Sequence, residues 1–388
     1  MTLPLAITAS AACSALGPNV AALEAALATG RSGLRAAGPD LPFATFVGAV
    51  TSELAALPPE LQPFDTRLAR LVSHLLTAIA PEVSRARARW GDARVGVFLG
   101  TSNAGILQTE EADAVRVRTG ALPADFDFSR QHAYGGALAV LRSLSGVRGP
   151  GWVNSTACSS SAKVLACAQR LIAADVIDAA IVGGADTLCQ TTLRGFHGLG
   201  VLSTTACRPF AAARDGISIG EGGALFLIER HGHAQARLLA VGESSDAHHM
   251  SAPHPHGDGA FLAMQRALGA AGLEPSAVDH VNAHGTATKQ NDAAEALAIA
   301  RLLGAEVPVT STKAYTGHLL GAAAGIELVA VMHALRTGWI PANLGAAPVD
   351  AELRIAVQQW GEQRQVRHVL SNSFAFGGNN ASVLVGAA

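Results

Sequence analysis

The chain has 388 residues, of which 49% are apolar, 15% are charged and 5% are aromatic, and its formal net charge is −2. This composition is typical of a large, well-buried globular protein, and the length favours two halves of similar size. A nearly neutral chain has no electrostatic footprint for nucleic acid or for an anionic membrane surface, so we expect neither as a partner.

The N-terminal stretch MTLPLAITASAACSALG has no basic leader, so it reads as a first strand rather than a signal peptide. We expect no membrane span, because no apolar run reaches about 18 residues. Five cysteines are scattered without CxxC spacing, a pattern that favours reduced thiols and predicts a cytoplasmic protein. They are Cys13, Cys158, Cys167, Cys189 and Cys207.

Short apolar strands alternate with helices along the chain. In order, we expect a helix at 65–80, a strand at 94–100, a helix at 159–175, strands at 178–184, 225–229 and 237–242, a helix at 260–273, a strand at 277–285, helices at 291–303 and 319–336, and strands at 366–373 and 381–386. Asp65 is placed to cap the first helix. The strands at 225–229 and 237–242 are expected to be adjacent, with HGH in the turn between them. The alternation predicts an α/β protein with buried, largely parallel sheets, and the pattern before about residue 230 recurs after about 237.

Two cysteines lie in the stretch NSTACSSSAKVLACAQRL (154–171). Cys158 stands where the expected helix begins, and a helix N-terminus stabilises a thiolate and lowers the pKa of a thiol. Cys167 lies inside the helix among apolar residues and reads as a small packed hydrophobe. A lone cysteine is more often inert core, so a nucleophile here needs a partner.

Three later segments supply candidate partners. Each has an ordinary structural explanation by itself, since a strand-end histidine or a Gly-Gly turn is common. They are NAHGTATKQND (282–292) with His284, STKAYTGHLLGAAAGIE (311–327) with Lys313, His318 and Glu327, and NSFAFGGNN (372–380), whose glycine turn can point N–H groups at a ligand.

Together with TACSS, these motifs resemble the β-ketoacyl-acyl carrier protein synthases of the elongating, decarboxylating type, which are condensing enzymes of fatty-acid and polyketide assembly. RPFAAARDGISIGEGGALFLIE (208–229) resembles the family's RPF…RDG…GEG block, and SDAHHMSAPHPHGDG (245–259) resembles its loop before the second half. The resemblance covers almost the whole chain. It implies a thiolase-like α/β fold, in which duplicated halves (here 1–232 and 233–388) form a five-layered α-β-α-β-α sandwich.

By position in the motifs, the resemblance implies that Cys158 is the acylated nucleophile and that His284 and His318 serve decarboxylation. Lys313 is implied to pair with Glu327 beneath the site. The N–H groups of Cys158 and Phe376 are implied to form the oxyanion hole. The implied substrate-binding residues are Thr286, Thr288, Asn103, Phe374 and Phe376.

The reaction that the resemblance implies is the decarboxylative condensation of a malonyl thioester with an acyl group on Cys158. No metal or organic cofactor is expected, because the substrates ride on the phosphopantetheine arm of an acyl carrier protein. The chain is expected to form a homodimer, or a heterodimer with a related subunit. Arg67 and Arg70 lie on one face of the first helix and are expected to meet an acidic carrier, with a merely solvated face as the alternative.

Other functions fit the sequence less well. GISIG (216–220) matches the GxSxG pattern of serine hydrolases, but a glycine turn and a strand follow where that motif needs a helix. A thiolase needs a second cysteine near the C-terminus, and an initiating synthase uses His and Asn. An inactive partner that sets chain length usually lacks the cysteine. A cluster of histidines in one loop could also suggest a metal site, but prolines interrupt the loop and regularly spaced Cys or Asp ligands are lacking. The histidines are His248, His249, His254 and His256.

The run TSNAG after Gly100 departs from the family's pattern. Asn103 falls where an apolar side chain is expected to line the acyl pocket, and a buried amide needs partners. A water network or a more polar acyl chain is therefore expected there, which favours a specialised polyketide or polyene pathway over a plain long-chain fatty acid. Ala211, in place of an acidic residue, is a milder departure. Acyl chain length and starter unit stay open.

Overall fold

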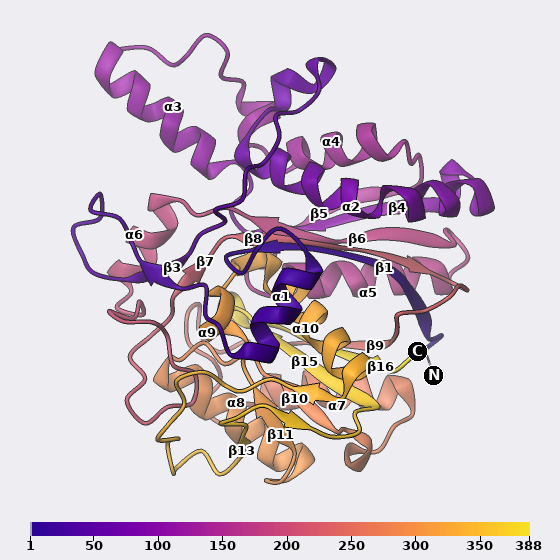
Figure 1. Ribbon diagram of the computed structural model, residues 1–388, viewed down its shortest axis with the longest axis vertical. Helices are drawn as coiled ribbons and strands as arrows, with labels where there is room; N and C mark the ends of the chain where they lie inside the picture. Colours follow the sequence, from indigo (N-terminus) through magenta and orange to yellow (C-terminus); the bar gives the residue numbers. More distant parts are fainter. Residues whose placement is uncertain (1) are drawn as a thin grey trace.

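The computed structural model describes residues 2–388, and its 11-stranded sheet consists of two parts of the same design, called the first and second sheet below (Figure 1). In each sheet the first three strands are antiparallel and the following ones are parallel. The first sheet runs in the order β1 (Leu5–Ser14), β8 (Gly222–Glu229), β6 (Ala179–Asp186), β4 (Val95–Gly100) and β5 (Gly151–Asn154). The second runs β9 (Ala236–Ser245), β16 (Asn379–Gly386), β15 (His368–Phe374), β10 (His280–Asn282), β11 (Pro308–Thr310) and β13 (Ala356–Val357). Three residue pairs between β1 and β9 join the two sheets.

Helices form the other three layers (Figure 1). One outer layer contains α2 (Arg67–Trp90) and α4 (Gly135–Ser145), and the opposite one contains α7 (Asp258–Ala271) and α8 (Lys289–Leu303). Between the sheets lie α5 (Ser160–Ala173) and α10 (Ala323–Thr337), each of which contacts strands of both sheets. The expected five-layered sandwich with duplicated halves is confirmed.

The remaining elements are short or peripheral. The helices are α1 (Val20–Thr29), α3 (Ile106–Thr119), α6 (Gln190–Gly198) and α9 (Lys313–Thr316). The strands are β2 (Arg35–Ala36), β3 (Phe46–Gly48) and β7 (Ile219–Gly220) in one small sheet, and β12 (Trp339–Ile340) with β14 (Glu362–Gln363) in another.

The structure corrects three expectations. The sheets are mixed rather than largely parallel, because β1 and β9 each start an antiparallel set. The strands at 225–229 and 237–242 are not adjacent, because β1 lies between β8 and β9. Thr66, not Asp65, caps α2 by accepting a hydrogen bond from the backbone N–H of Ala69 at 3.1 Å.

The stretch Leu320–Thr337, which ends in α10, meets the length and hydropathy of a membrane-crossing helix, contrary to the expectation that no run does so. However, 89% of it is buried inside the protein, where α10 lies between the two sheets. A helix that is surrounded by protein on every side is expected to be apolar around its whole circumference. Burial in the protein therefore accounts for the hydropathy of this stretch.

Each of the two helices between the sheets, α5 and α10, follows a turn. In each turn, the residue three positions before the helix has a left-handed backbone conformation. Ala157, before α5, has φ 50°, and Leu320, before α10, also has φ 50°. A positive φ is unfavourable for a residue with a Cβ atom, so the surrounding packing imposes it. The turn at Ala157 immediately precedes Cys158, whose side chain contacts His318 just before α10.

Candidate active site

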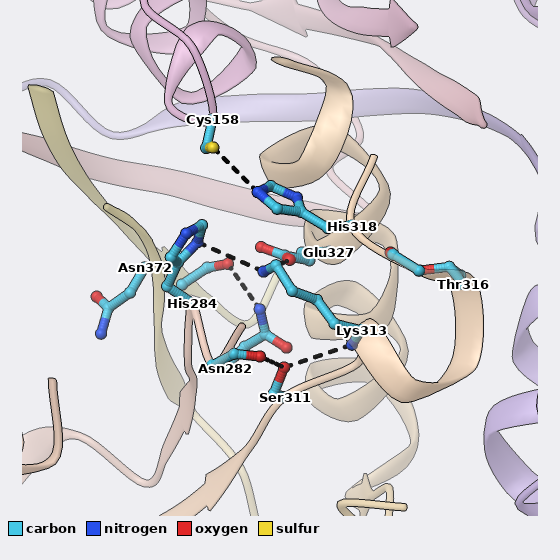
Figure 2. A network of polar contacts seen from close by, with 12 residues as sticks. Cys158, Asn282, His284, Ser311, Lys313, Thr316, His318, Glu327 and Asn372 are labelled. Carbon is cyan, nitrogen blue, oxygen red and sulfur yellow. Dashed lines mark hydrogen bonds and ion pairs between the residues drawn. The ribbon is translucent and has the colours of Figure 1, made fainter. Parts of the chain in front are cut away.

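Cys158 lines a pocket at the N-terminal end of α5, with 7% of its surface exposed. Its Sγ is 3.0 Å from Nε2 of His318, which comes from the turn before α10 (Figure 2). A thiol just before α5 and an imidazole just before α10 are therefore direct neighbours. By contrast, Cys167 is half-buried further along α5 and contacts Arg170.

His284 stands beside His318, with ring centroids 5.2 Å apart and the rings nearly perpendicular. It follows β10, and its backbone continues into a glycine turn at Gly285. Burial, followed by the nearby Lys313 ammonium, lowers the pKa of both imidazoles well below the usual histidine value. Both rings are therefore neutral at physiological pH.

Lys313 and Glu327 form a fully buried ion pair beneath the histidines (Figure 2). The Lys313 Nζ lies 2.6 Å from Glu327 Oε1 and 3.4 Å from Nδ1 of His284. An ammonium can only donate, so Nδ1 of His284 accepts and the ring proton resides on Nε2. Lys313 thus fixes the tautomer in which His284 can donate a hydrogen bond from Nε2.

The Cys158 thiol does not have the lowered pKa that its place at a helix N-terminus predicts. Burial raises the pKa of Cys158 to about 11, and it outweighs the opposing effects of Lys313 and of the backbone N–H groups of Phe376 and Cys158. Removal of water destabilises the thiolate more than the partial positive charge of the helix N-terminus stabilises it. The resting site is therefore a neutral thiol facing a neutral imidazole.

This pKa predicts slow alkylation of Cys158 at neutral pH. We expect its rate of modification by iodoacetamide, followed by peptide mass spectrometry, to rise tenfold per pH unit from about pH 8 to about pH 10 without a plateau, because the thiolate is the nucleophile. Lys313→Met should move the curve to higher pH, since the ammonium favours the thiolate. A plateau near pH 7 would instead show that the pKa of Cys158 is lowered.

The pocket brings together most of the side chains that the motifs single out. Its lining includes both histidines and, at its sides, Thr286, Thr288, Phe374 and Phe376. The Thr286 and Thr288 hydroxyls lie 3.0 Å apart. The backbone N–H groups of Phe376 and Cys158 both act to lower the pKa of Cys158, so they lie near its sulfur, where two oxyanion donors would converge.

Asn103 is buried but does not line this pocket. Its amide donates to the Thr187 carbonyl at 3.2 Å and to Cys189 Sγ at 3.5 Å, and it accepts from the Thr192 hydroxyl at 3.1 Å. Protein groups therefore satisfy the amide, so neither a water network nor a polar acyl chain is needed. The argument from Asn103 for a specialised pathway loses its physical basis.

Arg67 and Arg70 do not offer free positive charge. Arg67 forms a two-pronged pair with the buried carboxylate of Glu221, with Nε 2.5 Å from Oε1 and a terminal nitrogen 2.8 Å from Oε2. Arg70 pairs in the same way with Asp65, at 2.7 Å for both contacts. Their predicted role in carrier docking stays a prediction, and the pairing gives it no support.

Two buried acids hold the His284 loop, and the sequence reasoning missed them. Glu295 on α8 accepts hydrogen bonds from the N–H groups of His284 and Gly285, both at 2.8 Å. Asp292 accepts from the N–H groups of Phe210 at 2.8 Å and Ala287 at 3.2 Å. Burial raises the pKa of Glu295 to about 7. The available signal was a carboxylate on the apolar face of the expected helix at 291–303.

The structure supports neither of the alternative sites, the serine-hydrolase motif GISIG and the histidine-rich loop. Ser218 of the GISIG motif is fully buried, its hydroxyl accepts from the Cys207 N–H at 3.1 Å, and strands follow it. Within residues 2–388, one group of three donors could hold a metal ion, and it is Cys158, His284 and His318 rather than the histidine-rich loop. Their donor atoms lie within 4.8 Å of one another.

Two family models match the chain: "Beta-ketoacyl synthase, N-terminal domain" over residues 3–234 and "Beta-ketoacyl synthase, C-terminal domain" over residues 235–347. A 3-oxoacyl-acyl-carrier-protein synthase 2 of Mycobacterium tuberculosis is 39% identical over 249 residues, which is 60% of this chain and 60% of that protein. Nodulation protein E of Rhizobium meliloti is 35% identical over 301 residues, or 74% of each chain. The alignment with the first of these relatives thus spans about three fifths of its length.

Solved structures resemble the whole chain. A ketosynthase in complex with its chain length factor, from Xenorhabdus doucetiae, has a TM-score of 0.93 and 38% identity and covers 100% of this chain and 98% of that one. The ishigamide ketosynthase/chain length factor has a TM-score of 0.91 and 25% identity, with 100% of both chains covered.

Proposed function

Because the chain belongs to the β-ketoacyl synthase family, we propose that it is a β-ketoacyl-acyl carrier protein synthase that lengthens an acyl chain by decarboxylative condensation. One observation carries the proposal: a thiol and two neutral imidazoles share one buried pocket, with Cys158 Sγ 3.0 Å from His318 Nε2. A neutral donor pair suits an enolate, which a full positive charge would over-stabilise.

In the first half of the reaction, the Cys158 sulfur attacks the carbonyl carbon of an acyl thioester borne by the carrier. The thiol proton passes to His318 Nε2 as the C–S bond forms. No free thiolate then has to form from a thiol whose pKa is about 11. The tetrahedral oxyanion accepts hydrogen bonds from the N–H groups of Cys158 and Phe376. The bond to the carrier sulfur then breaks, and the departing thiolate takes the proton.

In the second half, the thioester carbonyl of a malonyl unit lies between His284 and His318. The bond to the carboxylate carbon breaks, CO2 leaves, and the electron pair becomes an enolate whose oxygen accepts hydrogen bonds from Nε2–H of each imidazole. His318 carries its ring proton on Nε2 at this stage, because the sulfur that it faced is now acylated and has no proton to give. The enolate carbon attacks the acyl carbon on Cys158, so that a C–C bond forms, the C–S bond breaks, and the Cys158 thiolate that leaves takes up one proton from water to restore the thiol. Lys313 acts by holding His284 in its donating tautomer.

The proposed reaction needs no metal or organic cofactor, since both substrates arrive on the phosphopantetheine arm of an acyl carrier protein. We expect excess EDTA to leave turnover unchanged and added Zn²⁺ to inhibit it, because Cys158, His284 and His318 present sulfur and nitrogen donors within 4.8 Å. The measurement is condensation rate with each addition. A loss of activity in EDTA that Zn²⁺ restores would contradict this prediction.

Intact-protein mass spectrometry tests the function directly. The protein is incubated with a panel of acyl-carrier thioesters of different length and polarity, and the mass added to the chain identifies which acyl groups load. Addition of malonyl-carrier should then remove the adduct and release a carrier-bound product two carbons longer. A chain that loads no member of the panel, or that keeps its adduct in the presence of malonyl-carrier, is not an elongating synthase. The panel also distinguishes a fatty-acid from a polyketide substrate.

A second candidate is the catalytic subunit of a heterodimer. It is favoured by the similarity over the whole chain to a ketosynthase that was solved with its chain length factor. Native mass spectrometry of the chain expressed alone separates the two assemblies, because a homodimer with full activity excludes the need for a companion. Monomers that condense only after a related subunit is added would support the heterodimer.

We further propose a division into halves at 1–232 and 233–388, which falls in the turn between β8 and β9. The first half contains Cys158 and the second contains both histidines. A cytoplasmic location is also proposed, supported by the five cysteines, all of which are free thiols.

A further inference from the structure

Asp186 is a fully buried carboxylate that no step of the proposed reaction uses. It is the last residue of β6. The groups that stabilise its negative charge are hydrogen-bond donors from two other parts of the chain. They are the hydroxyl of Thr101 and the backbone N–H groups of Ser102, Asn103 and Gly321.

The carboxylate joins two segments that are far apart in the sequence. Its Oδ1 accepts from the Thr101 hydroxyl at 2.7 Å and from the N–H groups of Ser102 and Asn103 at 3.0 and 2.8 Å. Its Oδ2 also accepts from the Ser102 N–H, at 3.0 Å, and a Cβ atom at Gly321 would lie 2.9 Å from this oxygen. The Gly321 N–H acts to lower the pKa of Asp186, so it lies near the carboxylate. Asp186 therefore holds the loop after β4 against the turn before α10.

The turn that this carboxylate holds also carries His318. Before the turn, the His318 N–H donates to the Ser218 carbonyl at 2.7 Å, and the His318 carbonyl accepts from the Gly220 N–H at 2.9 Å. After it, Leu320 has φ 50°, which is unfavourable for a residue with a Cβ atom. The next N–H, that of Gly321, is the one near the carboxylate, so this contact restrains the chain directly after the unfavourable residue.

The four groups that bind Asp186 are all donors, which is why this position suits a carboxylate and not an amide. An ionised carboxylate accepts at both oxygens, whereas the amide of asparagine has the same shape but presents an NH2 group in place of one oxygen. Burial raises the pKa of Asp186 to about 6, so the carboxylate is ionised at physiological pH. An amide here would leave one of the buried donors without an acceptor, which is unfavourable.

We propose that Asp186 is a positioning residue for acyl loading, which holds the turn after His318. That turn keeps Nε2 of the imidazole 3.0 Å from Cys158 Sγ. The inference rests on the proposed function, in which His318 receives the thiol proton. Asp186 does not line the pocket, so it acts only through the backbone between residues 318 and 321.

The test compares acyl loading of Asp186→Asn and Asp186→Glu with that of Asp178→Asn. Asp178 immediately precedes β6 at the end of the strand opposite to Asp186, and it is a buried carboxylate paired with Arg94 and Arg230. It is therefore a matched loss of a buried acid away from the site. Single-turnover loading from an acyl-pantetheine thioester is followed by intact mass at several thioester concentrations, and the free energy of unfolding in urea is measured for each form.

The two substitutions at Asp186 separate shape from acceptor capacity. Asparagine keeps the shape and loses one acceptor oxygen, whereas glutamate keeps both oxygens and adds a methylene group. A displacement of about 1 Å at a reacting group can slow a reaction about 10²-fold, so we expect the maximum loading rate to fall about tenfold or more in Asp186→Asn and about threefold in Asp186→Glu. The KM for the thioester should stay within about twofold of the wild-type value in both variants, because Asp186 lies outside the pocket lining. Asp178→Asn should lower the free energy of unfolding and load at the wild-type rate.

A wild-type maximum loading rate in either variant at Asp186 would overturn the proposal, so Asp186→Glu provides the answer if Asp186→Asn does not fold. A smaller fraction of loaded chains with an unchanged rate constant would also overturn it, because partial unfolding reduces how many chains load and not how fast the folded ones do. Equal slowing in Asp178→Asn would assign the effect to general destabilisation. Failure of the wild type to load from any thioester would refute the proposed function itself, and that result is read before any variant is made.

Discussion

The Cys158→Ala variant is expected to lose acyl transfer at least about 10⁴-fold while still releasing CO2 from a malonyl thioester. Transfer requires a covalent bond to the sulfur, and no other group in the described pocket replaces it. Decarboxylation requires only the two imidazoles, and alanine leaves them and the backbone N–H of residue 158 in place. Intact mass measures the adduct, and labelled malonyl thioester measures the CO2.

Cys167→Ala is the matched control, because it removes a thiol from the same helix without touching the pocket. It should load as the wild type does. An acyl adduct that persists in Cys158→Ala and disappears in the double variant with Cys167→Ala would assign the nucleophile to Cys167 and refute the role of Cys158.

The His284→Ala and His318→Ala variants should each release CO2 about 10²–10³-fold more slowly, since each removes one donor to the enolate oxygen. Both should still accept an acyl group on Cys158. The structure adds a distinction: His318 Nε2 is 3.0 Å from the thiol, whereas His284 Nδ1 faces Lys313. Loading should therefore be slower in His318→Ala than in His284→Ala. Wild-type decarboxylation in either variant would remove that histidine from the mechanism.

The residues that we propose as catalytic could be singled out from the sequence because each stands in a short local motif. Cys158 precedes a helix, His284 follows a strand, and Lys313 and His318 lie within six residues of each other, so neighbouring residues alone set their backbone context. The five layers and the duplication followed from the resemblance, and the structure confirms them. Periodicity by itself predicted the helices and strands but not which strands are neighbours.

The missed features all depend on contacts between distant residues. Arg67 meets Glu221, which is 154 positions away, and Asn103 meets Cys189, which is 86 positions away. Insertion of β1 between β8 and β9 pairs the start of the chain with residues beyond 220. The pKa of Cys158 was predicted in the wrong direction because a helix end is visible in the sequence, whereas the burial that outweighs it is a property of the whole fold.

The matching left-handed turns at Ala157 and Leu320 show how a duplicated chain comes to have one reactive centre instead of two. The residue after Ala157 is Cys158, the proposed nucleophile, and the residue after Leu320 is Gly321. A Cβ atom at Gly321 would lie 2.6 Å from the Ser102 nitrogen and 2.9 Å from a carboxylate oxygen of Asp186, so no side chain fits there. The second turn keeps the shape of the first but only packs, so under the proposed mechanism these two positions together carry one acyl group per polypeptide.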